Sequence, residues 1–135
     1  MYLLDTNTCI TYLRGGESGA VAKKLATCAP DCVALCSIVI AELLYGAALS
    51  ASPAKTAAEV RAFCAPFDSI PFDDRAAEEY GEIRAHLKRQ GTPMGPNDLM
   101  IAAIAVANAL TLITHNTAEF QRVPLLEIED WQLAK

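Results

Sequence analysis

The chain has 135 residues, of which 53% are hydrophobic, and its 16 acidic and 11 basic residues give a net charge of −5. This length predicts one domain, residues 1–135, with a core large enough to be stable without disulfides or metals. The negative charge excludes a protein that coats nucleic acid through bulk electrostatics, although a local acidic site can still reach phosphates through bound cations.

The N-terminal sequence and the number of cysteines indicate in which cellular compartment the protein is expected. The N-terminus has neither the basic segment nor the apolar stretch of a signal peptide, and the apolar runs are too short to span a membrane, so we expect a cytoplasmic protein. Five cysteines, an odd number, argue against a disulfide framework. Cys28, Cys32 and Cys36 repeat every fourth residue, but no Cys-x-x-Cys or histidine pair completes a zinc site. We expect buried, reduced thiols.

The first half of the chain alternates apolar runs with helical patterns. The expected elements are a strand over 2–5, a helix after Thr6–Thr8 that ends near Leu13, a helix over 18–28, a strand over 33–37, and helices over 38–49 and 53–64. Polar residues at Thr6–Thr8 and Ser37 are suited to cap the helices that follow them. Gly15-Gly16 is expected to stop the first helix.

The second half continues the alternation. It predicts a strand over 68–72, a helix that follows the cap Asp73-Asp74 and ends near Arg89, a helix from Pro96 to Ala107, strands over 111–114 and 125–128, and a helical turn over 118–120. Strands that alternate with helices predict an α/β fold, in which a parallel sheet has helices on both faces.

The helix from Pro96 to Ala107 is apolar on nearly every side and carries one carboxylate, Asp98, in its first turn. A helix of this composition belongs in the interior. A buried charge must be paired or bound to a metal, so Asp98 cannot be an ordinary surface group. The free amides and the positive end of the helix dipole help to keep Asp98 ionised.

Acidic residues from four parts of the sequence are expected at one edge of the sheet. In open parallel sheets, sites form beyond the C-terminal ends of the strands. Asp5 ends the first strand, and Glu42 lies near the start of the helix that leaves the second. Asp98 returns to the same edge because only residues 108–110 separate its helix from the fourth strand. Glu119 follows that strand by one turn.

Carboxylates without histidine or cysteine pairs favour Mg²⁺ or Mn²⁺ over zinc. Such ions activate water and neutralise a phosphodiester, singly or as a pair. Plainer alternatives remain open for each residue: Asp5 could only cap the first helix, Glu42 could lie on the surface, and Glu119 could be solvated. His115 and His86 are single histidines, and the sequence assigns neither a chemical role.

Four segments follow one another in a specific order and spacing. They are Leu3–Asn7, then Ser37 with Ala41–Gly46, then Gly95–Ala103, then Leu112–Phe120 followed by Val123-Pro124 and Glu129–Trp131. Together they resemble the PIN-domain family, and more closely its VapC-type toxins, the ribonuclease halves of toxin–antitoxin pairs. The resemblance covers essentially the whole chain. It implies a PIN-like three-layer α/β/α sandwich with a parallel central sheet of about five strands.

The resemblance also implies an activity, that of a Mg²⁺-dependent endoribonuclease toxin of a VapBC-type system, with Mn²⁺ as the alternative ion. Asp5, Glu42 and Asp98 would be the catalytic carboxylates that bind metal. Many family members have Asp where this chain has Asn116, and Glu119 would supply the fourth metal-binding charge instead, directly or through a water. Metal-activated water would attack an RNA phosphodiester and leave a 5′-phosphate and a 3′-hydroxyl.

Further expectations concern supporting residues and partners. The groups that would orient carboxylates and waters are Thr6, Asn7, Ser37, Thr114 and Asn116. By the same resemblance, the protein would be a homodimer neutralised by a small VapB-type antitoxin, with partner contacts on the helical pair 38–64 and a structured RNA such as tRNA as substrate. The candidate RNA-facing cations are Arg14, Lys23, Lys24, Arg84, Lys88 and Arg89, although a solvated helix face explains most of them equally well.

Three other functions compete with this interpretation. A haloacid-dehalogenase-type phosphatase would have a second Asp where this chain has Asn7. A response-regulator receiver would need an early acidic pair and a lysine after the fifth strand, and Asp73-Asp74 are in the wrong setting. A PIN-like module without catalysis, kept for binding or regulation, is disfavoured by the three unusual carboxylates, but Asn116 keeps it open.

Overall fold

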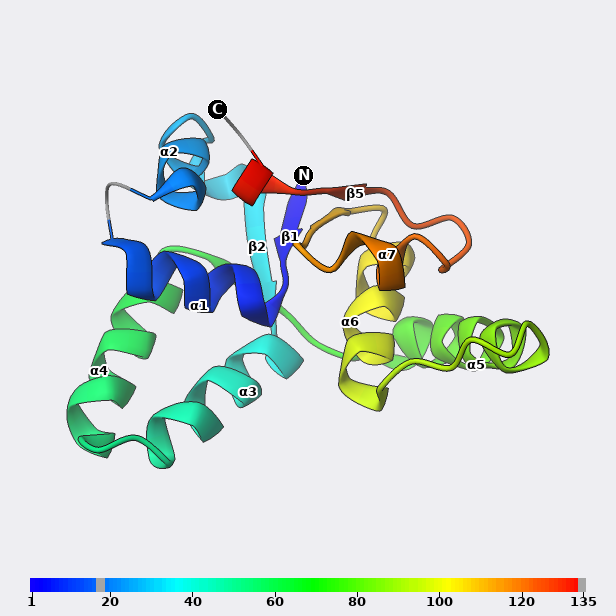
Figure 1. Ribbon diagram of the computed structural model, residues 1–135, viewed down its shortest axis with the longest axis horizontal. Helices are drawn as coiled ribbons and strands as arrows, with labels where there is room; N and C mark the ends of the chain where they lie inside the picture. Colours follow the sequence, from blue (N-terminus) through cyan, green and yellow to red (C-terminus); the bar gives the residue numbers. More distant parts are fainter. Residues whose placement is uncertain (17–18, 134–135) are drawn as a thin grey trace.

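A computed structural model describes residues 1–16 and 19–133 (Figure 1). The strands are β1 (Tyr2–Leu4), β2 (Val33–Cys36), β3 (Asp68–Ile70), β4 (Thr111–Ile113) and β5 (Ile128–Glu129). The α-helices are α1 (Thr6–Gly15), α2 (Ala20–Ala26), α3 (Ser37–Ala48), α4 (Pro53–Cys64), α5 (Asp74–Arg89), α6 (Pro96–Ala107) and α7 (Thr117–Phe120). The described residues also include the 3₁₀ helices η2 (Pro30–Cys32) and η3 (Trp131–Leu133).

The five strands form one parallel sheet in the order β3-β2-β1-β4-β5. The chain steps from β1 to β2 to β3 in one direction, and later from β4 to β5 in the other. Right-handed crossovers then place α1–α4 on one face of the sheet and α5–α7 on the opposite face, and Figure 1 shows these two groups on either side of β1 and β2. The expected α/β fold with a five-stranded parallel sheet is confirmed.

The order of the strands reverses between β1 and β4. Leu4 at the end of β1 pairs with Ile113 at the end of β4, so the two strands finish level with one another. Crevices form at such a reversal, beyond the carboxyl ends of the strands. The fold therefore puts the residues that follow Leu4 and Ile113 beside each other.

Helix α6 lies in the interior, as its apolar composition predicts. Leu99 and every residue from Ile101 to Ala105 are buried. The helix packs along α5 and returns to the sheet through a tight turn in which Ala109 has a φ of 52°. Its N-terminus consequently lies at the same edge of the sheet as the ends of β1 and β4.

Several predicted boundaries are wrong by a few residues. The first strand ends at Leu4 because Asp5 is already the N-cap of α1. Ser37 is the first residue of α3 rather than its cap, and Cys36 occupies the cap position. The third strand ends at Ile70 and not at residue 72. Helix α2 is shorter than the predicted range 18–28, whose first residue lies outside the described residues.

The fifth strand is the largest error, since it covers Ile128–Glu129 instead of residues 125–128. Leu125 has a φ of 67°, so the backbone there cannot be extended. Its side chain is also 89% exposed. The apolar pair Leu125-Leu126 suggested burial that the structure does not give to Leu125. Across the described part of the chain, no helix has the length and apolar character needed to cross a bilayer.

Candidate active site

The candidate site lies where β1 and β4 end. Asp5 follows β1 directly, and its backbone N–H donates to the carbonyl of Ile113 at 3.1 Å. Thr114 follows β4 and donates its N–H to Glu129 at 2.9 Å. Both residues are therefore fixed by sheet hydrogen bonds at the point where the strand order reverses.

Asp5 is only 4% exposed, and Thr8 and Thr114 lie at its carboxylate. The N–H of Thr8 donates to Oδ1 at 2.8 Å, which makes Asp5 the N-cap of α1, and the Thr114 hydroxyl also hydrogen-bonds the carboxylate. Burial raises the pKa of Asp5, these hydrogen bonds lower it in part, and the charge of Glu42 raises it. The plainer prediction of a helix cap is thus correct, and the same carboxylate is also within electrostatic reach of a second acid.

Glu42, on the second turn of α3, is held at both oxygens. The hydroxyl of Thr6 donates to Oε1, and the side-chain amide of Asn97 donates to Oε2 at 3.1 Å. Thr6 begins α1 and Asn97 is the second residue of α6. Three helices that are far apart in sequence therefore meet at this carboxylate, and the side chain is partly buried rather than free on the surface.

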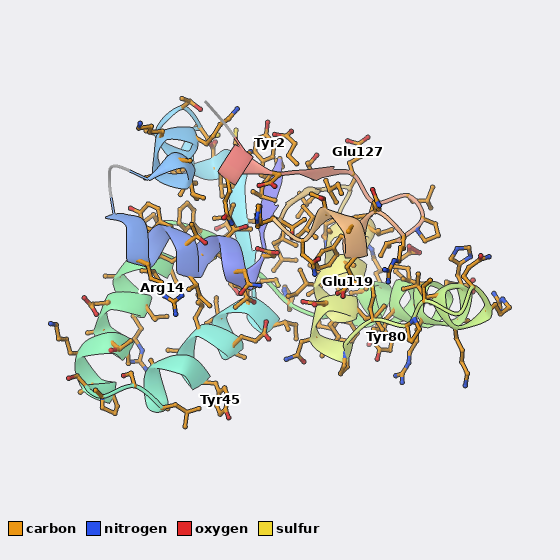
Figure 2. All side chains as sticks on the ribbon, in the orientation of Figure 1. Tyr2, Arg14, Tyr45, Tyr80, Glu119 and Glu127 are labelled. Atoms are coloured by element: carbon orange, nitrogen blue, oxygen red, sulfur yellow. The ribbon has the colours of Figure 1, made fainter. Side chains whose placement is uncertain are left out.

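Asp98 follows Asn97 and faces Glu119 of α7. Burial, then the facing Glu119 carboxyl, then the charges of Glu42 and Asp5 raise the pKa of Asp98 to about 6. Figure 2 shows Glu119 between α7 and α6. The four acids predicted at one edge thus act on one another electrostatically.

The chemistry of this group fits a hard divalent cation. All its ligands are oxygen atoms, and within residues 1–16 and 19–133 none of the four acids forms an ion pair with lysine or arginine. Oε1 of Glu119 is buried and has no hydrogen-bond partner among the described residues. In the same part of the chain, no three Asp, Glu, His or Cys side chains already form a ligand set. Ion binding therefore requires these like-charged side chains to turn toward one another.

The predicted supporting residues divide into two groups. Thr6 contacts Glu42, and Thr114 contacts Asp5 and accepts a 3.0 Å hydrogen bond from the N–H of Asn116. Asn7, Ser37 and Asn116 are exposed, and no hydrogen bond joins their side chains to the acids in the described part of the chain. The side chains of Asn7, Ser37 and Asn116 thus do not orient the carboxylates through hydrogen bonds in the described part of the chain.

The contacts of Asn97 and His115 were not predicted from the sequence. Asn97 lies beside Asp98 at a helix start, and this position was the only signal of its role. His115 is not isolated, because its Nδ1 lies 2.8 Å from Oδ2 of Asp130. Pairing between residues 15 positions apart in two loops leaves no periodic trace, so only the fold reveals it.

The prediction of buried thiols is correct for Cys9 and Cys36 but wrong for Cys32, which is exposed, and Cys28 and Cys64 are only partly buried. All five are free, and Cys9 and Cys36 are buried close to the acids. Burial raises the pKa of the Cys36 thiol to about 11 and that of the Cys9 thiol well above its usual value. Thiols in this state are poor nucleophiles and poor metal ligands.

Comparison with known proteins gives a consistent result. Residues 2–126 match the model of the PIN domain. The chain is 38% identical over 130 residues to a tRNA(fMet)-specific endonuclease VapC of Salmonella typhimurium, covering 96% of this chain and 97% of the relative. A crystal structure of DNA-bound VapBC from the same species superposes with a TM-score of 0.90 at 38% identity, with 96% and 97% of the two chains covered. VapBC2 from Rickettsia felis, bound to a promoter DNA fragment, also gives a TM-score of 0.90 at 35% identity, with coverage of 96% and 98%.

Proposed function

Since the chain belongs to the PIN-domain family and is a VapC-type ribonuclease toxin, we propose that it cleaves RNA at the carboxylates of Asp5, Glu42 and Asp98, with bound Mg²⁺. The observation that carries the site assignment is the convergence of these acids from three elements, with Glu42 held by Thr6 and Asn97 and Asp5 held by Thr8; their proximity and burial raise the pKa of Asp98. A carboxylate cluster of this kind is costly for the folded protein unless a cation neutralises it. Mn²⁺ has a similar ligand preference and is the alternative ion.

Each side chain has a defined part in this proposal. Asp5, Glu42, Asp98 and Glu119 bind the ion, which supplies Lewis-acid activation of water and neutralises charge on the phosphodiester. Thr6 and Asn97 fix the orientation of Glu42 through its two oxygens. The N–H of Thr8 and the hydroxyl of Thr114 fix Asp5. The protein thus holds the ligands at the ends of rigid elements, and the expected products are a 5′-phosphate and a 3′-hydroxyl.

Substrate and partner follow from the relatives. The Salmonella relative is named for tRNA(fMet), and we propose initiator tRNA as the substrate here. Because VapBC complexes superpose on the chain along nearly its full length, we also propose a VapB-type antitoxin as partner. The helical pair α3–α4 offers a contact surface, since Tyr45 and Leu49 are 68% and 70% exposed, and Figure 2 shows Tyr45 pointing away from the sheet. A homodimer stays a prediction.

The test compares wild type with Asp98→Asn after inducible expression, with Asp31→Asn as a control at an exposed acid outside the site. Wild type and Asp31→Asn should arrest growth, and the purified proteins should cut initiator tRNA when Mg²⁺ or Mn²⁺ is added but not in EDTA. Asp98→Asn should do neither. Equal growth arrest by wild type and Asp98→Asn, or no cleavage by wild type, would contradict the proposal and favour a binding module without catalysis.

A further inference from the structure

A groove of about 360 Å³ begins beside the acidic site and follows helix α1. One wall is formed by Asn7, Thr11 and Arg14, and the other by His115 and Asn116. The α1 residues are spaced three and four apart, so they share one face of the helix. Asn7 lies two positions after Asp5, and Arg14 lies two turns further, roughly 10 Å along the axis. The groove thus runs from Asn7, close in sequence to Asp5, toward a cationic end at Arg14.

His115 is held in a fixed orientation in this groove. A carboxylate only accepts hydrogen bonds, so the contact of 2.8 Å between Nδ1 and Oδ2 of Asp130 places a proton on Nδ1. Oδ1 of Asp130 accepts the backbone N–H of Gln132 at 2.9 Å, and the Asp130 side chain is only 8% exposed. Asp130 is therefore itself anchored. Nε2 of His115 is the ring nitrogen left to contact a ligand, and the imidazole is 57% exposed.

Arg14 is free to bind an anion at the far end of the groove. It is exposed, and it makes no hydrogen bond or ion pair with another residue in the described part of the chain. In Figure 2, Arg14 lies near the C-terminal end of α1, whereas Glu119 lies beyond its N-terminal end. A planar guanidinium can donate two parallel hydrogen bonds to one phosphate.

We propose that this groove binds the RNA strand beside the scissile phosphate, with Arg14 on the phosphate of a flanking nucleotide and Nε2 of His115 on the sugar–phosphate backbone next to it. This inference rests on the proposed function, because it takes the scissile phosphodiester to lie at the four acids. The free guanidinium of Arg14, and the position of Asn7 and Asn116 in the groove wall a few residues from Asp5 and Glu119, favour RNA over a protein ligand. Asp130 is then a positioning residue, since it acts only through the orientation of His115.

The experiment measures kcat and KM on initiator tRNA for Arg14→Gln, Arg14→Lys, His115→Ala and Asp130→Asn. Arg61→Gln removes the same charge at an exposed position outside the groove and is the matched control. Arg14→Gln and His115→Ala should each raise KM about tenfold, as expected for the loss of a hydrogen bond with a charged group, and change kcat less than twofold. Arg14→Lys should recover part of the loss, and Arg61→Gln should match wild type.

Two further measurements separate binding from folding. Binding of RNA to the Asp98→Asn protein should show a salt dependence whose slope falls by about 0.7 on adding Arg14→Gln, the value for one lost phosphate contact on a single strand. Asp130→Asn should raise KM in the wild-type background and add little to His115→Ala, since both remove the same contact. A loss of thermal stability alone would not give this pattern.

Distinct outcomes identify which idea fails. If wild type cleaves no RNA, the proposed function is wrong. If wild type cleaves but Arg14→Gln and His115→Ala keep its KM and its salt slope, only the groove assignment is overturned. If the variants keep that KM but no longer co-purify with the VapB-type antitoxin, the groove binds the protein partner and the RNA assignment is overturned as well.

Discussion

The side-chain amide of Asn97 donates a 3.1 Å hydrogen bond to Oε2 of Glu42 and thereby ties the start of α6 to α3. The residue after Asn97 is Asp98, so the same turn of helix supplies one proposed metal ligand and the group that orients another. Thr6 completes the arrangement by donating to Oε1 of Glu42. Glu42 is thus the carboxylate of the site that is fixed entirely by side chains.

Replacing Asn97 by alanine should therefore impair the metal site without removing a ligand. Groups that orient metal ligands typically contribute 10–100-fold to metal affinity or activity. We expect Asn97→Ala to raise the Mg²⁺ concentration for half-maximal cleavage about tenfold, because Glu42 gains rotational freedom. A titration of RNA cleavage with Mg²⁺ measures this.

The matched control is Asn108→Ala at the other end of α6. The Asn108 side chain donates to the carbonyl of Ile104 at 2.8 Å, so its loss should affect the helix end and not the acids. We expect reduced thermal stability with an unchanged Mg²⁺ requirement. An equal change in Mg²⁺ requirement for both variants would show that Asn97 acts through the stability of α6 alone.

Thr6 offers a test of the second contact to Glu42. Valine has nearly the shape of threonine but no hydroxyl, so Thr6→Val removes the hydrogen bond to Oε1 with little change in volume. We expect a loss of activity of about tenfold or more for Thr6→Val, and near wild-type activity for Thr6→Ser. Similar activities of the valine and serine variants would mean that the hydroxyl is dispensable.

Asp98 should have opposite effects on stability and on metal binding. Its raised pKa means that its charged form is disfavoured in the folded protein at neutral pH. Asp98→Asn should stabilise the protein in EDTA by about 1 kcal/mol after allowance for partial exposure, or roughly 3–5 °C in Tm. Mg²⁺ should raise the Tm of wild type and leave that of Asp98→Asn nearly unchanged. Thermal denaturation at pH 7 measures both effects. A Tm of Asp98→Asn below that of wild type in EDTA would contradict the prediction.

The raised pKa of Asp98 also predicts that the stability of the folded protein depends on pH. In the folded chain the pKa of Asp98 is about 6, against 3.8 for an ordinary carboxyl, so the folded state binds more protons between these values. Stability in EDTA should be greatest below about pH 4 with respect to this group, and should fall as the pH rises through about 6. The raised pKa of Asp5 acts in the same direction. Asp98→Asn should show a weaker decline, measured by urea denaturation.

The fold was largely predictable because its signals are local. Apolar runs and helix caps such as Asp73, which accepts the N–H of Ala76 at 3.0 Å, place most elements within a few residues. Uniform apolar composition also predicted that α6 is interior. The predicted bounds of the fifth strand were wrong because Leu125 is an apolar residue with a left-handed backbone conformation. The hydrophobic pattern alone cannot distinguish such a residue from one in a buried strand.

The convergence of the four acids at one edge of the sheet was also predictable, since chain direction alone brings strand ends and helix starts there. Their supporting contacts were not. The bonds from Asn97 to Glu42 and from His115 to Asp130 depend on rotamers and on how separate elements pack, and no spacing in the sequence encodes them. Ser37 shows the converse, because its position in the motif suggested a contact that its exposed side chain does not make.

The fourth acidic position gives the sharpest test of the metal site. Glu119 faces Asp98 and has one buried oxygen without a partner among the described residues, whereas Asn116 is exposed at the N-cap position of α7. Glu119→Gln keeps the shape and removes the charge, so it should raise the Mg²⁺ requirement for RNA cleavage about tenfold or more. Adding Asn116→Asp should restore part of the loss, because it returns a carboxylate to the same edge of the sheet. Glu127→Gln, at an exposed acid, is the control. If Glu119→Gln leaves the Mg²⁺ titration unchanged, Asp5, Glu42 and Asp98 suffice, and Glu119 serves only to raise the pKa of Asp98.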